Sequence, residues 1–92
     1  MREIEFTSQF RKDFKRVKKD PNNKDLVSIL DTALDRLIND ERLAANFRVH
    51  KLVGKYKGFE ECHLKPDLLM IYLRLDNNLR LVRLGSHSEL FS

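Results

Sequence analysis

The spacing of apolar residues changes near residue 47, and this change limits the folds open to the chain. Before it, apolar side chains recur at intervals of three and four residues, which is typical of amphipathic helices. After it, they form short runs separated by Gly, Pro, Asp and Asn, which is typical of strands joined by turns. Helices followed by strands, on a chain of 92 residues, predict a single α+β domain over residues 1–92.

The first half of the chain predicts one strand and two helices. Residues 2–6 alternate apolar and charged side chains, which indicates a strand. A helix follows, with Thr7 or Ser8 as its N-cap, and the Pro-Asn-Asn run at residues 21–23 ends it. The periodic apolar face of residues 24–39 predicts a second helix. We expect the two helices to form a hairpin that packs on a sheet.

The second half predicts an antiparallel meander. We expect three strands, over residues 59–65, 68–75 and 79–84. Pro66 and Asp67 form the first turn, and the Asp-Asn-Asn run at residues 76–78 forms the second. Residues 85–92 are a short tail. The expected element order is therefore β-α-α-β-β-β.

Composition excludes several classes of protein. The hydrophobic share of 41% is too high for a disordered chain. The longest apolar run, residues 68–73, is far too short to span a bilayer. Because Cys62 is the single cysteine, a disulfide framework and a multi-cysteine zinc site are both excluded. The acidic N-terminal segment does not resemble a secretory signal, so we expect a cytoplasmic protein that does not contact membranes.

Basic residues are concentrated in two stretches of the chain. The formal net charge is +4, and the basic excess lies in residues 1–20 and 47–92, on either side of a mildly acidic middle. The first predicted helix carries six cations on its polar face: Arg11, Lys12, Lys15, Arg16, Lys18 and Lys19. Such a face attracts polyanions such as RNA, although ordinary solubility explains a net charge of this size equally well.

The three histidines, His50, His63 and His87, all lie in the second half. If the last strands are neighbours in the sheet, their ends bring the imidazoles together with Asp67 and Arg83. RNA cleavage by internal transphosphorylation needs a base, an acid and a cation for the phosphorane, and these side chains supply all three without a metal. The same His and Asp residues are plausible zinc ligands, although no H-E-x-x-H motif is present. Residue spacing also leaves open that they are ordinary surface side chains.

Three segments of the chain resemble one toxin family in order and spacing. They are residues 50–59 (HKLVGKYKGF), residues 61–72 (ECHLKPDLLMIY) and residues 83–91 (RLGSHSELF). Together with the opening residues 5–13, they are similar to the YafQ branch of the RelE/ParE superfamily. The resemblance implies a RelE-like fold, with a two-helix hairpin on a twisted antiparallel meander. It also implies a type II toxin with an antitoxin partner, acting as a ribosome-dependent endoribonuclease on mRNA in the ribosomal A site.

The resemblance also implies roles for individual residues. The expected catalytic residues are His50 as general base, His87 as general acid, and His63 and Asp67, which orient the substrate and tune the imidazoles. Four residues are expected to contact RNA: Arg83 at the phosphate, Phe91 at the mRNA, and Lys51 and Lys55. The basic helix surface is expected to contact ribosomal RNA, and neither a metal nor a cofactor is expected. Two other functions remain open: a ParE-like inhibitor of DNA gyrase that is not an enzyme, and a stand-alone RNA-binding domain.

Overall fold

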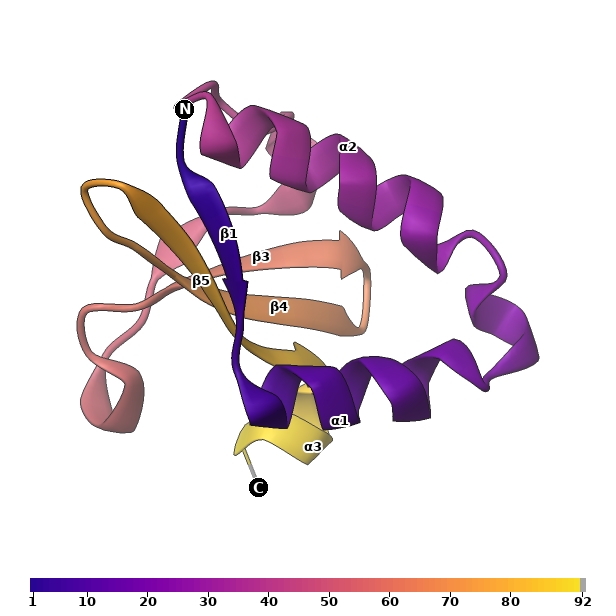
Figure 1. Cartoon of the computed structure of the whole chain (residues 1–92). Coiled ribbons are helices and arrows are strands. Elements are labelled where there is room, and N and C mark those ends of the chain that lie inside the picture. The colour runs from indigo at the N-terminus through magenta and orange to yellow at the C-terminus, as the bar shows by residue number, and fades with distance from the viewer. Residues whose placement is uncertain (92) are drawn as a thin grey trace.

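The computed structural model of the chain describes residues 1–91 (Figure 1). Its strands are β1 (Glu3–Phe6), β2 (His50–Lys51), β3 (Glu60–Lys65), β4 (Leu68–Arg74) and β5 (Asn78–Gly85). Its α-helices are α1 (Ser8–Lys18), α2 (Leu26–Ile38) and α3 (His87–Phe91). Short 3-10 turns cover Pro21–Asn23, Ala45–Phe47 and Gly54–Tyr56. The predicted α+β class and the order of its main elements are confirmed.

The five strands form one mixed sheet in the order β1-β5-β4-β3-β2. The predicted meander is confirmed, because β3, β4 and β5 pair antiparallel in sequence order. In contrast to an all-antiparallel sheet, β1 pairs parallel with β5. A parallel pair needs a long crossover rather than a hairpin, and here almost the whole chain lies between the two strands. No local feature of the sequence therefore predicts the pairing of β1 with β5.

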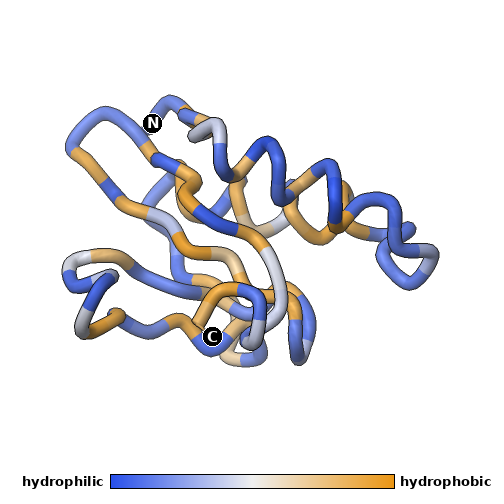
Figure 2. The backbone as a smooth tube through the Cα atoms, turned by 90° about the horizontal axis from the view of Figure 1, so that it is seen from below, coloured by the Kyte–Doolittle hydropathy of each residue, from blue (hydrophilic) through white to orange (hydrophobic). Residues whose placement is uncertain are grey.

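Helices α1 and α2 cover one face of the sheet and share a core with it (Figure 1). Phe10 and Leu30 from the helices meet Cys62, Met70 and Tyr72 from the strands in this core. Figure 2 shows alternating apolar and polar positions along much of the chain. In β4, by contrast, residues 68–72 are all buried, because Leu69 and Ile71 pack in a second cluster on the other face of the sheet. Burial raises the pKa of the Cys62 thiol to about 12, so this cysteine is a neutral core side chain.

The boundaries of the first helix follow from its caps. The Thr7 hydroxyl accepts a hydrogen bond from the Phe10 amide at 3.0 Å and donates to the Val82 carbonyl at 3.2 Å. Thr7 is therefore the N-cap, one of the two predicted residues. The second helix begins at Leu26, two residues later than predicted, because residues 21–23 form a 3-10 turn first.

The C-terminal segment, predicted as a tail, contains the short helix α3. Ser86 and Glu89 form a capping box there, in which the Ser86 amide donates to Glu89 Oε1 at 2.8 Å and the Glu89 amide donates to Ser86 Oγ at 3.2 Å. Leu90 packs on Leu69 and Ile71, on the sheet face opposite the two long helices. The S-x-x-E spacing was the sequence signal for this helix. Ser92 lies outside the described residues.

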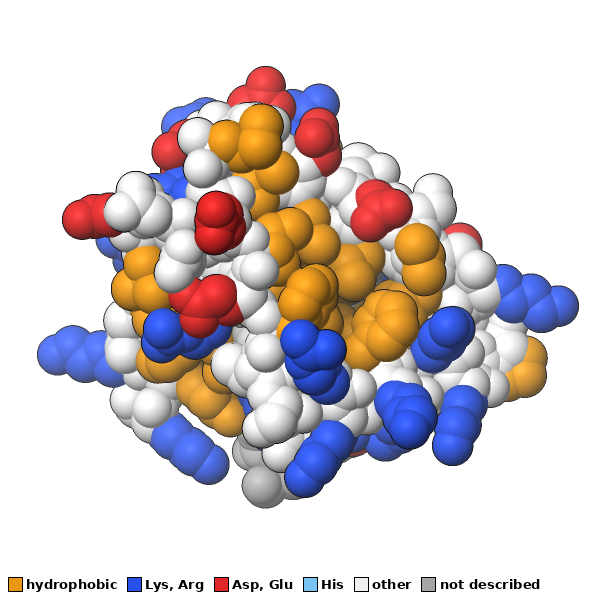
Figure 3. Space-filling view, in the orientation of Figure 1, with side chains coloured by type: hydrophobic (Ala, Val, Ile, Leu, Met, Phe, Trp, Pro, Cys, Tyr) orange, Lys and Arg blue, Asp and Glu red, His pale blue; other side chains and the backbone are white. Residues whose placement is uncertain are grey.

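The fold has an apolar groove on its surface. Between α1 and α2 the surface is hollowed and floored with apolar side chains (Figure 3), in a groove of about 540 Å³ lined by Phe6, Phe10, Arg11, Phe14, Lys15, Val27, Leu30, Asp31 and Leu34. Within residues 1–91, no helix is long and apolar enough to cross a membrane.

Candidate active site

Strands β2 and β3 place two of the three histidines beside a buried carboxylate. His50 pairs with Glu61 across the two strands, and the two-residue repeat of β3 puts Glu61 and His63 on the same face. Glu61 Oε1 lies 3.1 Å from Nε2 of His50 and 3.6 Å from Nε2 of His63. The two imidazole centroids are 6.1 Å apart. The structure therefore brings together two predicted residues around a third that sequence reasoning did not single out.

The orientation of His50 follows from its other ring nitrogen. Nδ1 lies 3.0 Å from the backbone carbonyl oxygen of Arg48. A carbonyl accepts hydrogen bonds, so Nδ1 carries the proton and Nε2 is the nitrogen that faces Glu61. Arg48 has a left-handed backbone, with φ of +47°, an uncommon conformation outside glycine. The ring of His50 is therefore held at both nitrogens, by the Arg48 carbonyl and by the Glu61 carboxylate.

Glu61 is a buried carboxylate whose hydrogen-bonding capacity is partly unused. Its residue exposure is 3%, and among residues 1–91 neither its Oε2 nor Nδ1 of His63 has a hydrogen-bond partner. Leaving buried polar atoms without partners costs free energy, and such atoms are retained mainly where a site uses them. The signal in the sequence was an acidic residue two positions before His63 on a predicted strand.

The same three side chains have the geometry of a metal site. His50, Glu61 and His63 each offer one ligand atom, and these atoms all lie within 4.8 Å of one another. Two imidazole nitrogens and one carboxylate oxygen are a common ligand set for zinc and other transition metals. This group differs from the sequence-based candidate, in which Asp67 was the carboxylate.

A second group of predicted residues gathers at the start of α3. The Asp67 carboxylate, in the turn between β3 and β4, accepts a hydrogen bond from the His87 backbone amide at 3.0 Å. The His87 ring lies against Phe91, with centroids 5.1 Å apart, and Phe91 meets Tyr56 edge-on at 6.0 Å. Asp67 thus positions the first residue of α3, whereas the carboxylate beside the imidazole of His63 is Glu61.

Arg83 adds a guanidinium to this second group. Its Nε and Nη2 donate to the two oxygens of the Asp13 carboxylate at 2.8 and 3.3 Å. The hydrogen bonds with Asp13 raise the pKa of Arg83 above its usual value. Arg83 is therefore a permanent cation.

The two groups lie on one face of the sheet, on neighbouring cross-strand rows. His63 pairs with Leu69, and Leu69 pairs with Gly85, two residues before His87. From β3, which carries His63, to β5, two strand spacings amount to about 10 Å. His50 on β2 lies one strand spacing further away. This open face is the candidate active site.

Some of the predicted basic residues are exposed to solvent, and others contact neighbouring side chains. Lys12, Lys15 and Lys18 on α1, Lys19 at its C-cap and Lys51 on β2 are exposed cations. Lys55 is exposed too, but its Nζ lies over the Tyr56 ring, 5.6 Å from the centroid. Arg11 instead lies over the Phe6 ring, 5.4 Å from its centroid. Arg16 is engaged by Asp13 at 2.9 Å and by Glu89 at 3.0 Å.

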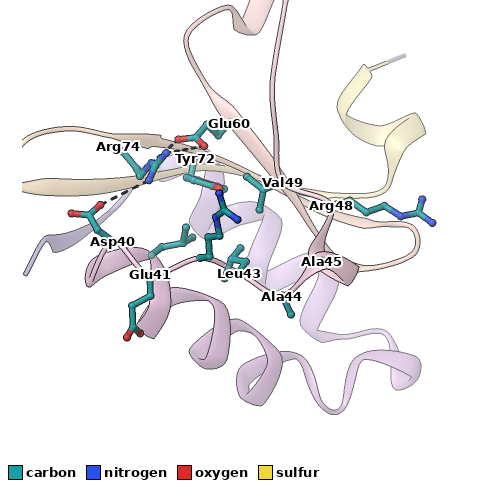
Figure 4. Close-up of a pocket in the computed structure, with 12 residues that line it drawn as sticks. Asp40, Glu41, Leu43, Ala44, Ala45, Arg48, Val49, Glu60, Tyr72 and Arg74 are labelled. Carbon is teal, nitrogen blue, oxygen red and sulfur yellow. Dashed lines mark hydrogen bonds and ion pairs between the residues drawn. The ribbon is translucent and has the colours of Figure 1, made fainter.

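A cavity of about 390 Å³ lies at the other end of the fold, between the end of α2 and strands β3 and β4 (Figure 4). Part of its charged rim is paired internally, because Arg74 binds Glu60 at 2.6 Å and approaches Asp40 at 3.9 Å. Tyr72 on its floor belongs to the core shared with the helices. The cavity is therefore on the opposite sheet face from Glu61 and His63.

Comparison with known proteins gives one consistent result. Residues 2–92 match the family model described as a bacterial toxin of a type II toxin–antitoxin system, YafQ. The chain is 36% identical to mRNA interferase toxin YafQ of Escherichia coli K12, over 98% of this chain and 96% of that protein.

Solved structures agree with this match. The toxin in the E. coli DinJ–YafQ complex is 34% identical, with a TM-score of 0.80 over all of both chains. A metal-bound toxin from Helicobacter pylori is 45% identical, with a TM-score of 0.84 over 99% of this chain and 100% of that one.

Proposed function

Because this chain belongs to the YafQ family of bacterial type II toxins, we propose that it is an endoribonuclease that cleaves mRNA on the ribosome. The name of its E. coli relative, an mRNA interferase, supports the substrate. The observation that carries the proposal is the open sheet face, where two imidazoles and a buried carboxylate lie across the strands from a third imidazole and a guanidinium.

The proposed reaction is transphosphorylation within the RNA. A base takes the proton of the 2′-hydroxyl, the 2′-oxygen forms a bond to the neighbouring phosphorus, and the bond to the 5′-oxygen breaks. An acid gives its proton to that leaving oxygen, which leaves a 2′,3′-cyclic phosphate and a 5′-hydroxyl. Base and acid at matched positions typically contribute 10²–10⁴-fold each to such a reaction.

We assign the base to His50 and the acid to His87. The contacts of His50 with the Arg48 carbonyl and the Glu61 carboxylate stabilise the imidazolium that forms when the ring takes a proton. His87 is exposed at the start of α3, where its ring can reach a leaving oxygen. Arg83 supplies the cation for the phosphorane, and Phe91 offers an aromatic face for a base of the mRNA.

His63 and Asp67 have supporting roles in this proposal. His63 shares the Glu61 carboxylate with His50, so it orients that carboxylate, and Asp67 holds the His87 amide. The cations of α1, together with Lys51 and Lys55, would contact ribosomal RNA and mRNA through phosphates. In this scheme the acid, the base and the cation all come from the protein, so catalysis needs no metal.

A cognate antitoxin is the proposed protein partner, because the E. coli relative forms a complex with DinJ. The groove between α1 and α2 suits a helix from such a partner. Its floor is apolar, Phe6 and Val27 are 44% and 51% exposed, and Arg11 and Lys15 face Asp31 across it. An amphipathic helix with acidic residues toward α1 and basic residues toward α2 would complement this charge pattern.

The test is a primer-extension map of a translated message. Purified wild-type protein should cut the message only when ribosomes are translating it, and His87→Ala should lower the cleavage rate by about 10²–10⁴-fold. Because His87 is exposed, the variant should unfold at the wild-type temperature. Full activity of His87→Ala would contradict the role of His87. An intact message with inhibited DNA supercoiling would favour a gyrase inhibitor, and RNA binding without cleavage would favour an RNA-binding domain.

A further inference from the structure

The fully buried residue Asp13 is the strongest feature that the proposed function leaves unexplained. It lies on α1 with 0% exposure, among the core side chains of that helix. A carboxylate in such a place is costly unless every oxygen is paired. Four donors meet it: the Arg83 guanidinium, Arg16 Nη1 at 2.9 Å, the Leu84 amide at 3.0 Å and Gln9 Nε2 at 3.2 Å.

The first of these donors belongs to the candidate active site. Asp13 holds Arg83 through two nitrogens, Nε and Nη2, which is the planar fork geometry that a carboxylate and a guanidinium share. Two contacts to one rigid plane restrict the rotation of that plane. The direction in which the guanidinium presents its remaining donors is therefore set largely by Asp13.

The second donor extends the network to α3. Arg16 bridges three elements, because it binds Asp13 on α1, the Leu84 carbonyl of β5 at 3.0 Å and Glu89 of α3 at 3.0 Å. In Figure 1, α3 lies directly beside α1 at the lower edge of the molecule. The helix with His87 and Phe91 is thus tied to α1 by the Arg16–Glu89 ion pair, and Arg16 is itself paired with Asp13.

Gly85 makes room for this bridge. A Cβ atom at this position would lie 2.9 Å from Arg16 Nη2 and 3.0 Å from Glu89 Oε1, closer than side-chain carbons approach such atoms. The ion pair between Arg16 and Glu89 therefore rests directly on the backbone of β5. A larger residue at position 85 would therefore displace the ends of the Arg16 and Glu89 side chains.

We propose that Asp13 is the positioning residue of the active site: it orients Arg83 directly, and through Arg16 and Glu89 it holds α3 with His87 and Phe91 over the open sheet face. This inference rests on the proposed function, since it assigns Asp13 a part in the same RNA cleavage. Asp13 itself touches no substrate. Its effect is geometric, and misplacement of catalytic groups by about 1 Å can cost 10²-fold in rate.

The first arm of the test uses Asp13→Asn, which keeps the side-chain shape and removes the charge. We expect kcat for cleavage of translated message to fall by about 10²-fold. In an Arg83→Ala background, the same change should cost much less, because no guanidinium remains to be oriented. Equal losses in both backgrounds would overturn the action through Arg83. Asp35→Asn, the same change on the exposed surface of α2, is the matched control and should leave kcat unchanged.

The second arm separates the ion pair from the helix cap. Glu89→Gln keeps the capping box, which accepts glutamine as well as glutamate, but removes the ion pair with Arg16. Glu89→Ala removes both. We expect Glu89→Gln to lower kcat with an unchanged unfolding temperature, and Glu89→Ala to lower kcat further. Wild-type kcat in Glu89→Gln would overturn the coupling to α3.

The third arm does not measure cleavage, and it can be carried out even if Asp13→Asn does not fold, because it uses the wild type. In the 15N–1H spectrum of the wild type, the Nε–H signals of Arg83 and Arg16 should exchange slowly with water, because both groups are held by carboxylates. Fast exchange of the Arg83 signal would overturn the proposal. If the wild type leaves translated mRNA intact, the proposed function fails, and this spectrum still decides whether Asp13 holds Arg83.

Discussion

At the scale of single residues, the histidines were visible in the sequence but their partners were not. His50 and His63 meet around Glu61, a pairing that depends on the register between β2 and β3. Because β2 has only two residues, it is too short to show a periodic pattern from which this register could be predicted. Asp67 follows Pro66 in a turn and reaches the His87 amide instead of an imidazole. Residue types alone could not decide between these two carboxylates.

A prediction at this scale concerns metal ions. Since Glu61 and the two imidazoles form a ligand set, Zn²⁺ or Cu²⁺ should bind there and occupy the nitrogens that the proposed catalysis needs. Cleavage of translated mRNA should therefore persist with a chelator selective for transition metals, with Mg²⁺ kept for the ribosome. It should fall on addition of one equivalent of Zn²⁺.

Glu61→Gln is the matched variant for this experiment. Loss of the carboxylate should weaken Zn²⁺ binding, measured by calorimetry, by at least about tenfold. Glu3→Gln, on β1 and far from the imidazoles, should bind Zn²⁺ like the wild type. Loss of cleavage in the chelator, restored by Zn²⁺, would show that the reaction depends on a metal.

At the scale of elements, helix periodicity and strand alternation predicted most boundaries to within two residues. One strand and one α-helix were not predicted. Residues 50–51 pair with β3 as a short edge strand, and residues 87–91 form α3 because of a capping box. Both carry candidate catalytic histidines, so the elements missed by pattern are those that present the site. Short elements depend on tertiary contacts more than long ones do.

The groove between α1 and α2 yields a prediction at the same scale. Val27→Glu places a charge on its apolar floor, and the affinity for the cognate antitoxin should fall by about 10- to 100-fold. Val27 is half exposed, so the fold should be unchanged, and cleavage by the free toxin should stay at the wild-type rate. Val49→Glu, at another half-exposed valine outside the groove, is the control. Equal loss of affinity in both variants would place the antitoxin elsewhere.

The basic surface of α1 gives a further prediction. Lys12 is exposed, and replacing it with glutamate should weaken the proposed contact with ribosomal RNA. We expect about a tenfold rise in the ribosome concentration needed for half-maximal cleavage, with a shallower dependence on salt. Lys24→Glu makes the same charge change outside α1. A rise of equal size in both variants would indicate an effect of net charge rather than of this helix.

At the scale of the whole molecule, the buried network around Asp13 ties α1, β5 and α3 together. Burial by itself raises the pKa of Asp13, but its hydrogen bonds outweigh burial and lower the pKa below the ordinary value of 3.8. A lowered pKa in the folded state adds stability that is present above the unfolded pKa and is lost as pH falls through the folded pKa. The network therefore stabilises the fold near neutral pH and fails in acid.

This sign gives a prediction for acid unfolding. As the pH falls below the ordinary pKa of 3.8, the free energy of unfolding should fall more steeply in the wild type than in Asp13→Asn, by up to about 1.4 kcal/mol per pH unit. Thermal or urea unfolding at constant ionic strength measures this slope. Asp35→Asn should follow the wild type. Identical slopes for Asp13→Asn and the wild type would mean that Asp13 does not hold its proton differently when folded.

The sequence by itself determined the class of the fold, the sites of the helices and main strands, and the three imidazoles. These follow from local periodicity and residue chemistry, which neighbouring residues along the chain decide. The tertiary structure alone decided the parallel pairing of β1 with β5, the carboxylate that His50 shares with His63, and the hydrogen bond between the buried Asp13 carboxylate and Arg83. Each of these joins residues on different elements. Strand register and helix packing settle such contacts, and no local pattern encodes them.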